Sequence, residues 1–338
     1  MSFLQHYAHR YKTSLTEVGR NMISNARLYP RPRLKPDVSF EGKVIIVTGG
    51  NRGIGRKVCD ILVDRKVRRV IIACRDVSLG QAAADDIKSK LPDATSEIAV
   101  YQLDLASRES VQEFASQIKE KETQVDVLIN NAGLLCTERK ETTDGQEQMI
   151  AINYFGTVLL TFLLFDHIHS SSTDPRIVFT CSLAHTEVRR LKIDDMNWEK
   201  EKSFPYFQVY GHTKLALLLF VKIFAGKAKE KGVLAHAVDP GVSKTDLGRE
   251  ANQRFGFSAP EFMMRGGIAR PSMRSVTEAA NSVLMPLTQR REDYDASKYN
   301  TTDGVYQRVS PGADDQEIAD KLWTLTADRL DLESMKSF

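Results

Sequence analysis

Short runs of β-branched residues alternate with longer helical stretches along most of this chain. The first run, KVIIVT at 43–48, is largely apolar and is followed by glycines, which predicts a strand buried on both faces. We expect further strands at 69–73, 97–101, 125–129, 176–180 and 234–238, with helices near 54–66, 77–90, 107–120, 144–170 and 206–230. Parallel strands joined by helices form right-handed crossovers. The pattern therefore predicts a doubly wound α/β fold with a central parallel sheet of about seven strands and helices on both faces.

The composition is that of an ordinary globular protein. Of 338 residues, 42% are hydrophobic and 27% are charged, which excludes a disordered chain, a collagen and a small disulfide scaffold. The four cysteines (Cys59, Cys74, Cys136 and Cys181) form no CxxC pair and stand near no histidine cluster, so we expect no metal site. Such thiols favour a reducing compartment. The sequence has no uninterrupted apolar run of membrane-spanning length and no signal-peptide pattern, so no spanning helix is expected.

The net charge of +3 is concentrated at the N-terminus. Residues 1–40 hold seven basic side chains against two acidic ones, a charge of +5, which leaves −2 for the remainder. Apolar residues recur there at helical spacing. Three interpretations stay open: a basic helix packed on the body or between the subunits of a homodimer, an interfacial helix that associates peripherally with a membrane, and a mitochondrial presequence. The expected location is therefore intracellular, either cytoplasmic or at a membrane surface, with the mitochondrion as a further alternative.

The first expected strand ends in a glycine-rich turn, TGGNRGIG at 48–55, that leads directly into a helix. In such a turn the backbone can approach a pyrophosphate closely, and the helix N-terminus offers free N–H groups. A turn of this kind between a buried strand and a helix predicts the dinucleotide site of a Rossmann fold. The expected cofactor-binding residues of the turn are Gly49, Asn51, Arg52, Gly53, Ile54 and Gly55.

The end of the second strand indicates which dinucleotide is bound. An acidic residue there is typical of NAD sites, whereas this chain has Arg75 after Cys74. A guanidinium suits a 2′-phosphate in charge and geometry, and Arg52 can reach the same group. The two arginines therefore favour NADP(H), the alternative being that both are ordinary surface residues. Further cofactor contacts are expected where the third and fourth strands end, at Asp104, Leu105, Asn131, Ala132 and Gly133.

A tyrosine and a lysine stand four residues apart in YGHTK at 210–214, and so share one face of the expected helix. Free tyrosine has a pKa of about 10, so it needs a nearby cation to exchange protons near neutrality. Lys214 can supply this charge and also hold ribose hydroxyls. Ser182 ends the fifth strand, where a hydroxyl can hydrogen-bond a substrate carbonyl. The alternatives are an exposed helix pair and a turn serine.

These motifs, in this order, resemble the classical short-chain dehydrogenase/reductase family over about residues 40–310. The resemblance rests on TGGNRGIG at 48–55, DL at 104–105, NNAG at 130–133, Asn153, Ser182, YGHTK at 210–214 and DPGVSKT at 239–245. Within the family the chain is most similar to the retinol-dehydrogenase-like group, which includes the X-linked dehydrogenase/reductase type. The marks of this group are ACRD at 73–76, SLAH at 182–185 and the long segment before Tyr210.

The resemblance implies a role for each matching residue. Tyr210 would be the general acid/base, Lys214 would lower its pKa and bind ribose, and Ser182 would orient the carbonyl. Asn153 would hold a water that links Lys214 to bulk solvent. The nicotinamide would be lined by Pro240, Gly241, Val242 and Thr245.

Two positions depart from the family pattern. Cys181 and Asp239 stand where a serine and a histidine are usual. His185 and His212 flank the catalytic segments, and we expect them to be structural or near the substrate, because a tyrosine already fills the acid/base role.

The implied activity is NADP(H)-dependent interconversion of a lipophilic alcohol and its aldehyde or ketone, of retinoid, isoprenoid or steroid type, by hydride transfer. Residues 244–276, rich in methionine and aromatic residues, are expected to form a substrate lid. Ordinary packing or a dimer surface is the alternative for that segment. A general xenobiotic carbonyl reductase and a non-catalytic NADP-binding regulatory protein stay open as other functions. Nucleic acid is not an expected partner, because the basic excess is local and lacks a recognition motif.

The expected domain organisation is one catalytic unit with attachments. A single Rossmann domain at 41–310 follows the basic N-terminal extension at 1–40 and precedes a helical extension at 311–338. The helix of that last segment, at about 314–330, is expected to begin with Asp314 as its N-cap.

Overall fold

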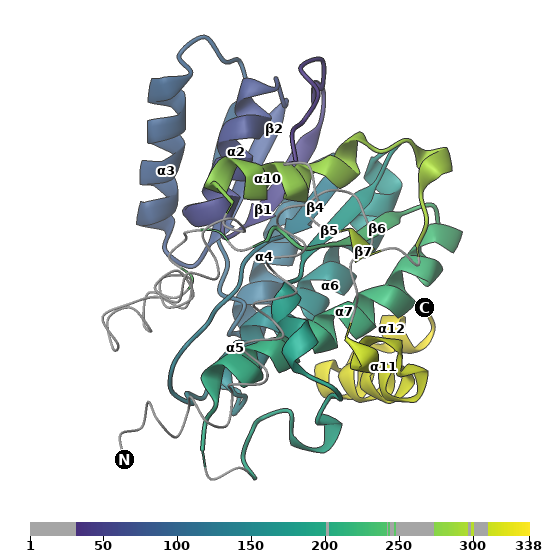
Figure 1. Cartoon of the computed structure of the whole chain (residues 1–338). Coiled ribbons are helices and arrows are strands. Elements are labelled where there is room, and N and C mark those ends of the chain that lie inside the picture. The colour runs from purple at the N-terminus through teal and green to yellow at the C-terminus, as the bar shows by residue number, and fades with distance from the viewer. Residues whose placement is uncertain are drawn as a thin grey trace.

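One parallel sheet organises the chain (Figure 1). The computed structural model describes residues 32–200, 203–241, 243, 247, 274–296, 299–300 and 310–338. Within them seven strands lie in the order β3-β2-β1-β4-β5-β6-β7, which confirms the predicted α/β fold. The strands are β1 (Val44–Thr48), β2 (Arg69–Cys74), β3 (Glu97–Gln102), β4 (Val127–Asn130), β5 (Arg176–Thr180), β6 (Leu234–Val238) and β7 (Tyr299–Asn300).

The strand order reverses between β1 and β4, and this reversal positions the site. In β1, Thr48 lies beside Ala73 of β2, and Val47 lies beside Ile129 of β4. The carboxyl ends of these strands are therefore level with one another. Open α/β sheets bind their ligands in the crevice that such a reversal creates.

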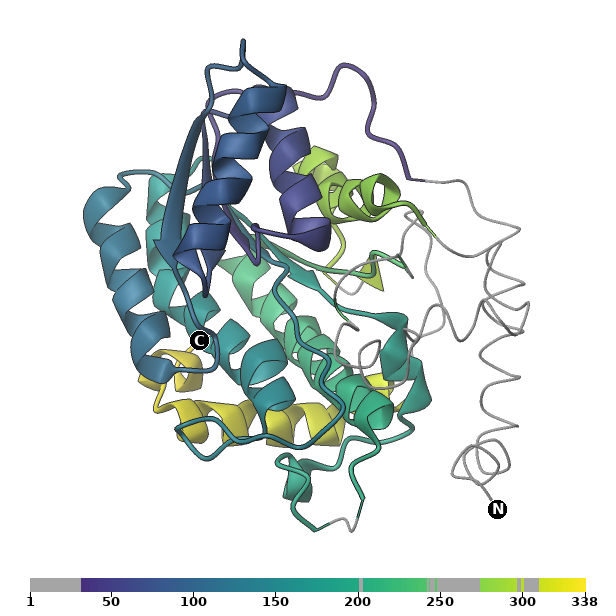
Figure 2. The same cartoon turned by 90° about the vertical axis from the view of Figure 1, so that its left-hand side faces the viewer.

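Helices cover both faces of the sheet (Figures 1 and 2). One face packs against α2 (Gly53–Asp64), α3 (Val77–Lys90) and α10 (Val276–Leu284), and the other against α4 (Arg108–Lys121), α6 (Gly156–Ser171) and α7 (Tyr206–Glu230). The residues of β1, β4 and β5 are buried throughout, because a parallel sheet covered on both sides leaves no face for water. Sequence analysis predicted all of these helices except α10.

Two helical stretches, Gln148–Ser171 and Tyr206–Glu230, are long and apolar enough to cross a membrane by length and composition. In each, 83% of the most apolar window is buried inside the protein. Core helices of a folded protein pass the same test, so packing against the sheet accounts for this composition. The two stretches are weak evidence for a membrane span.

The C-terminal residues share the core of the main domain. Helices α11 (Gln316–Leu330) and α12 (Glu333–Lys336) lie against the outer side of α6 and α7 (Figure 1). Trp323 stacks on Phe220 with ring centroids 5.6 Å apart, and Phe338 stacks on Phe224 at 5.4 Å. Residues 311–338 are thus built into the α/β body.

The predicted N-cap of the last long helix was wrong by one residue. The side chain of Asp315, rather than Asp314, accepts a hydrogen bond from the backbone N–H of Ile318. A tight turn at Pro311–Asp314 precedes the helix, because proline and glycine favour such a turn there. Asp314 ends this turn, and its carboxylate pairs with Lys222 at 2.6 Å.

The body also begins earlier than the predicted boundary at residue 40. Phe40 is buried and its N–H donates to the carbonyl of Arg65. Asn281 of α10 donates a hydrogen bond of 3.1 Å to the carbonyl of Pro32. Residues 32–40 therefore pack on the domain, whereas residues 1–31 lie outside the described part of the chain.

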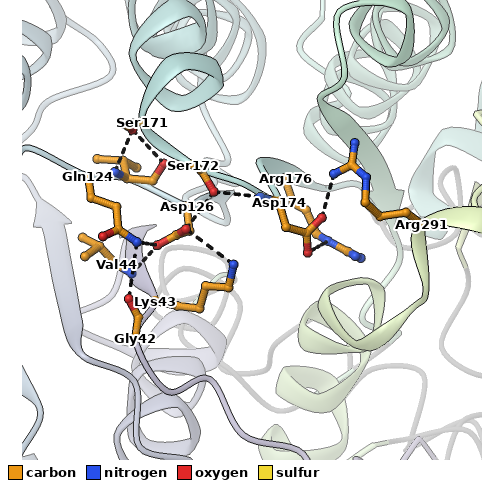
Figure 3. Close-up of polar contacts among 11 residues, drawn as sticks. Gly42, Lys43, Val44, Gln124, Asp126, Ser171, Ser172, Asp174, Arg176 and Arg291 are labelled. Carbon is orange, nitrogen blue, oxygen red and sulfur yellow. Dashed lines mark hydrogen bonds and ion pairs between the residues drawn. The ribbon is translucent and has the colours of Figure 1, made fainter.

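A charged network joins the amino ends of the central strands, at the edge opposite the crevice (Figure 3). The buried Asp126 carboxylate accepts hydrogen bonds from the backbone N–H of Val44 at 2.8 Å and from the Ser172 hydroxyl at 2.7 Å. Asp174 forms an ion pair of 2.7 Å with Arg291, which follows α10. These contacts fix the strand starts, so we assign this edge a structural role.

Candidate active site

A cleft of about 540 Å³ opens at the carboxyl ends of the strands, where the strand order reverses. Its walls come from the turns after strands β1 to β6 and from the start of α7. It brings together most of the residues that the sequence analysis selected. These are Gly49, Asn51, Arg52, Gly53, Ile54, Arg75, Asp104, Leu105, Asn131, Ala132, Gly133, Ser182, Tyr210, Lys214, Pro240 and Gly241. Gly55 and Asn153 lie behind these walls, and Val242 and Thr245 lie outside the described residues.

The glycine turn adopts a backbone that few other residues allow. Gly49 and Gly53 have φ of +66° and +57°, in the left-handed region. A Cβ atom on Gly55 would lie 2.4 Å from the carbonyl oxygen of Gly49, so α2 can approach the turn this closely only with glycine there. Helix α2 begins after Arg52 without a side-chain cap, and this leaves its first N–H groups available to an anion.

Thr48 joins the ends of β1 and β4, a role that sequence analysis missed. Its hydroxyl oxygen accepts hydrogen bonds from the N–H groups of Asn131 and Ala132 at 3.0 and 2.9 Å. The Asn131 side chain in turn donates to the Thr48 carbonyl at 3.0 Å, and the Asn130 side chain donates to the Thr161 hydroxyl at 3.1 Å. The two asparagines thus fix these strand ends and leave the loop that follows them beside the glycine turn.

The side chains of Ser182 and Tyr210 are hydrogen-bonded to each other in the wall of the cleft. Ser182 follows β5 and caps a short helical turn by accepting a hydrogen bond from Ala184 N–H at 3.2 Å. Tyr210 is 5% exposed, and burial raises its pKa above the usual range, while a hydrogen bond with the Ser182 side chain acts in the opposite direction. The tyrosine hydroxyl is therefore protonated at neutral pH and available as a proton donor.

Lys214 lies one turn further along α7. Its ammonium donates a 2.8 Å hydrogen bond to the Thr180 carbonyl and lies 5.7 Å from the centre of the Tyr210 ring. Burial lowers the pKa of Lys214 to about 8. Burial is the main cause of the raised Tyr210 pKa, and the nearby Asp239 carboxylate acts in the same direction. The lowering of that pKa by the Lys214 ammonium stays a prediction.

Asn153 lies in a π-helical turn, Ala151–Phe155, between α5 (Gln148–Ile150) and α6. Its side-chain oxygen accepts from the N–H of Leu134 at 2.7 Å, and its amide donates to the Leu134 carbonyl at 2.9 Å and to the Thr213 hydroxyl at 3.0 Å. A Cβ atom on Gly133 would lie 3.5 Å from the Asn153 oxygen and 3.7 Å from the Lys214 nitrogen. Both polar groups therefore lie next to Gly133 in the wall of the cleft.

The two residues that depart from the family pattern are both buried. The Asp239 carboxylate accepts from Gly241 N–H at 3.0 Å, and burial raises its pKa to about 6. Burial also raises the pKa of the Cys181 thiol, to about 12, so this cysteine is a neutral packing residue. Among the described residues, no group of histidine, cysteine, aspartate or glutamate side chains could hold a metal ion.

His185 and His212 lie in the packing around these segments. The Nδ1 of His185 is 2.6 Å from the Ser182 carbonyl oxygen, and burial lowers the pKa of this histidine. His212 packs edge-on against Trp198 with ring centroids 4.8 Å apart, and burial lowers its pKa to about 4. Both are neutral structural residues in this geometry, as one of the two expectations had it.

The fold and the cleft together define a Rossmann-type protein with a tyrosine, a lysine and a serine at the carboxyl edge of its sheet. Comparison with known proteins identifies the family to which this Rossmann-type protein belongs. The model of the short chain dehydrogenase family matches residues 43–192. Retinol dehydrogenase 13 of Homo sapiens is 35% identical over 88% of this chain and 87% of the relative, and retinol dehydrogenase 12 of Mus musculus is 30% identical over 88% and 89%.

Solved structures share the fold. An uncharacterized protein from Mycobacterium paratuberculosis aligns with a TM-score of 0.65 and 25% identity over 90% of this chain and 97% of its own. A short-chain dehydrogenase from Sphingobium yanoikuyae, solved with NADPH, aligns with a TM-score of 0.57 and 18% identity over 86% and 95%. The chain belongs to the short-chain dehydrogenase/reductase family. It is an oxidoreductase that acts on alcohol or carbonyl groups.

Proposed function

We propose that this enzyme uses NADP(H) to interconvert a lipophilic alcohol and its aldehyde or ketone, of retinoid, isoprenoid or steroid type. The observation that carries the proposal is a single cleft that holds Ser182, Tyr210 and Lys214 next to the glycine turn. Relatives named retinol dehydrogenases support the substrate class.

The described residues fit a dinucleotide. The uncapped start of α2 offers N–H groups to a phosphate, and Gly133 leaves space in front of Lys214. Arg52 and Arg75 are both exposed at the cleft, where guanidinium groups can pair with a 2′-phosphate. These two side chains favour NADP(H) over NAD(H).

The mechanism assigns a separate task to each side chain. A nicotinamide held in this cleft would supply the hydride for the carbonyl carbon. Ser182 donates a hydrogen bond that orients the carbonyl oxygen, and Tyr210 gives that oxygen its proton. Lys214 binds ribose hydroxyls, and with Asn153 it returns a proton to the tyrosine. Oxidation of the alcohol uses the same groups in reverse order.

An apolar wall lies beside Tyr210 and supports a lipophilic substrate. It is formed by the side chains of Leu134, Leu135, Ala184, Phe207 and Leu247. Such a wall binds hydrocarbon better than a sugar. Most of the predicted lid at 244–276 lies outside the described residues. Residues 1–31 also lie outside them, and their association with a membrane surface or with a second subunit stays a prediction.

A spectrophotometric screen tests the proposal. NADPH oxidation is followed with retinoid, isoprenoid, steroid and xenobiotic carbonyls, and NADH is tested in parallel. We expect turnover of lipophilic aldehydes or ketones with NADPH at a kcat/KM at least about tenfold above that with NADH. Preference for NADH would overturn the cofactor assignment, and NADPH binding without any turnover would favour a non-catalytic regulator.

Arg75→Ala is expected to raise the KM for NADPH about tenfold and to change the KM for NADH by less than about twofold, because only the phosphorylated cofactor loses a charge-assisted hydrogen bond. Arg68→Ala is the matched control, since Arg68 is an exposed arginine next to the opposite end of the same strand. Equal losses with both cofactors, or the same loss in both variants, would contradict the role of Arg75.

A further inference from the structure

The turn that carries Asn153 is held from outside the cleft by helix α11. Single π-turns interrupt the regular hydrogen bonding of a helix, so their geometry depends on their surroundings. Both residues that follow Asn153 in this turn contact α11. The hydroxyl oxygens of Tyr154 and Thr326 are 2.7 Å apart, and both side chains are fully buried. The guanidinium carbon of Arg329 lies 4.9 Å from the centre of the Phe155 ring.

The contact between Tyr154 and Thr326 is directional. The Thr326 hydroxyl gives its one hydrogen to the carbonyl of Leu322, at 2.6 Å. Tyr154 is therefore the donor in the bond between the two hydroxyls. Its ring packs edge-on against Phe155 and Phe220, with centroids 5.0 and 6.3 Å apart, in an apolar cluster. A buried hydroxyl that loses its partner is strongly unfavourable, so this bond fixes the turn relative to α11.

A second contact reaches the residues that enter the turn. The Asn197 side-chain oxygen accepts hydrogen bonds from Arg329 at 3.4 Å and from the backbone N–H of Glu147 at 3.2 Å. The Glu147 carboxylate in turn caps α5 by accepting from the N–H groups of Met149 and Ile150, both at 2.9 Å. Helix α11 is therefore connected to both sides of Asn153.

A displacement of Asn153 would be passed on to the reacting groups. Its side chain holds both backbone polar groups of Leu134, directly after Gly133 in the cleft wall. Its amide also bonds to Thr213, whose hydroxyl donates to the carbonyl of Tyr210 at 2.8 Å. We propose that Tyr154 and Thr326 are positioning residues for the acid–base site, because α11 fixes through them the turn that presents Asn153. The proposal rests on the proposed function only for its effect on turnover.

Thr326→Val removes the acceptor of the Tyr154 hydroxyl and keeps the shape of the side chain. We expect kcat to fall about tenfold while the KM values for cofactor and carbonyl change less than about twofold, since small displacements of catalytic groups reduce the chemical step. Thr326→Ser restores the hydroxyl and should return most of the lost kcat. Thr324→Val is the matched control, because Thr324 also donates to a carbonyl one turn earlier on α11 but is exposed.

Amide hydrogen exchange gives a readout that needs no turnover. The Leu134 N–H donates to Asn153, so Thr326→Val should speed its exchange about tenfold. The Gly49 N–H, bonded to Ala73 on the other side of the cleft, should keep its rate. Should Thr326→Val fail to fold, Tyr154→Phe removes the same bond from the other partner and is expected to give the same changes.

The outcomes separate this proposal from the proposed function. Unchanged kcat and unchanged Leu134 exchange in Thr326→Val, or equal changes in Thr324→Val, would overturn the positioning role even if the wild-type enzyme reduces carbonyls. If no carbonyl is reduced, the proposed function fails and the exchange measurement alone decides whether α11 holds the turn. Faster Leu134 exchange confined to Thr326→Val and Tyr154→Phe would support the contact.

Discussion

Tyr210→Phe is expected to lower turnover by about 10³-fold, within the range that a positioned proton donor contributes. The variant keeps the ring, which is buried among apolar neighbours, and loses the hydroxyl that Ser182 contacts. Hydride transfer would then leave negative charge on the substrate oxygen with no proton donor in place. The glycine turn is untouched, so the affinity for NADPH should change by less than about twofold.

Stopped-flow or steady-state NADPH oxidation measures the loss, and fluorescence titration with NADPH measures binding separately. Tyr206→Phe is the matched control, because Tyr206 lies one turn earlier on α7 and packs in the same apolar cluster. It should keep its activity. A Tyr210→Phe enzyme with more than about a tenth of wild-type turnover would contradict the assignment of this tyrosine.

The sequence predicted the sheet well because each of its first six strands is a self-contained apolar run. In KVIIVT, for example, burial on both faces requires a continuous run of apolar and β-branched residues, and this run coincides with β1, Val44–Thr48. Helix α10 was missed although Ser275 and Glu278 form a capping box at its start. With nine residues this helix has fewer than three turns, too few for its apolar periodicity to stand out in the sequence.

Site residues that belong to a motif could be predicted from the sequence. Residues that act through packing or through hydrogen bonds to distant parts of the chain could not. The residues of TGGNRGIG and YGHTK carry spacing that indicates a function. Thr48 and Thr213 carry none, since one threonine in a strand or helix has many ordinary explanations. The contact between Tyr154 and Thr326 joins residues far apart in the sequence, and only the folded arrangement of α11 and the π-turn brings them together.

Lys214→Met is expected to lower turnover by at least about 10²-fold and also to change how stability depends on pH. Lys214 is 3% exposed, and burial lowers its pKa from 10.5 to about 8. Below about pH 8 the folded and unfolded chains both carry the proton, and the buried charge is unfavourable to folding. Between about pH 8 and 10.5 only the unfolded chain keeps the proton on Lys214. The free energy of unfolding of the wild type therefore rises with pH in this range, compared with that of a variant without the Lys214 amine.

The free energy of unfolding of the wild type minus that of Lys214→Met should therefore rise by up to about 1.4 kcal/mol per pH unit in this window. Urea unfolding followed by circular dichroism at several pH values across the window measures both proteins. The cysteines and tyrosines of the unfolded chain titrate in the same range, but both proteins contain them, so they cancel in the difference. Lys227→Met, on the partly exposed part of α7 beside Trp323, is the matched control.

A difference that does not vary with pH would contradict a lowered pKa for Lys214. A slope without loss of turnover would instead separate the buried charge from catalysis. We expect both effects together, because they have one cause. The burial that makes the Lys214 ammonium unfavourable to folding also lets this group gain or lose its proton near neutral pH, close to Asn153 and Tyr210, where a proton has to be returned after each turnover.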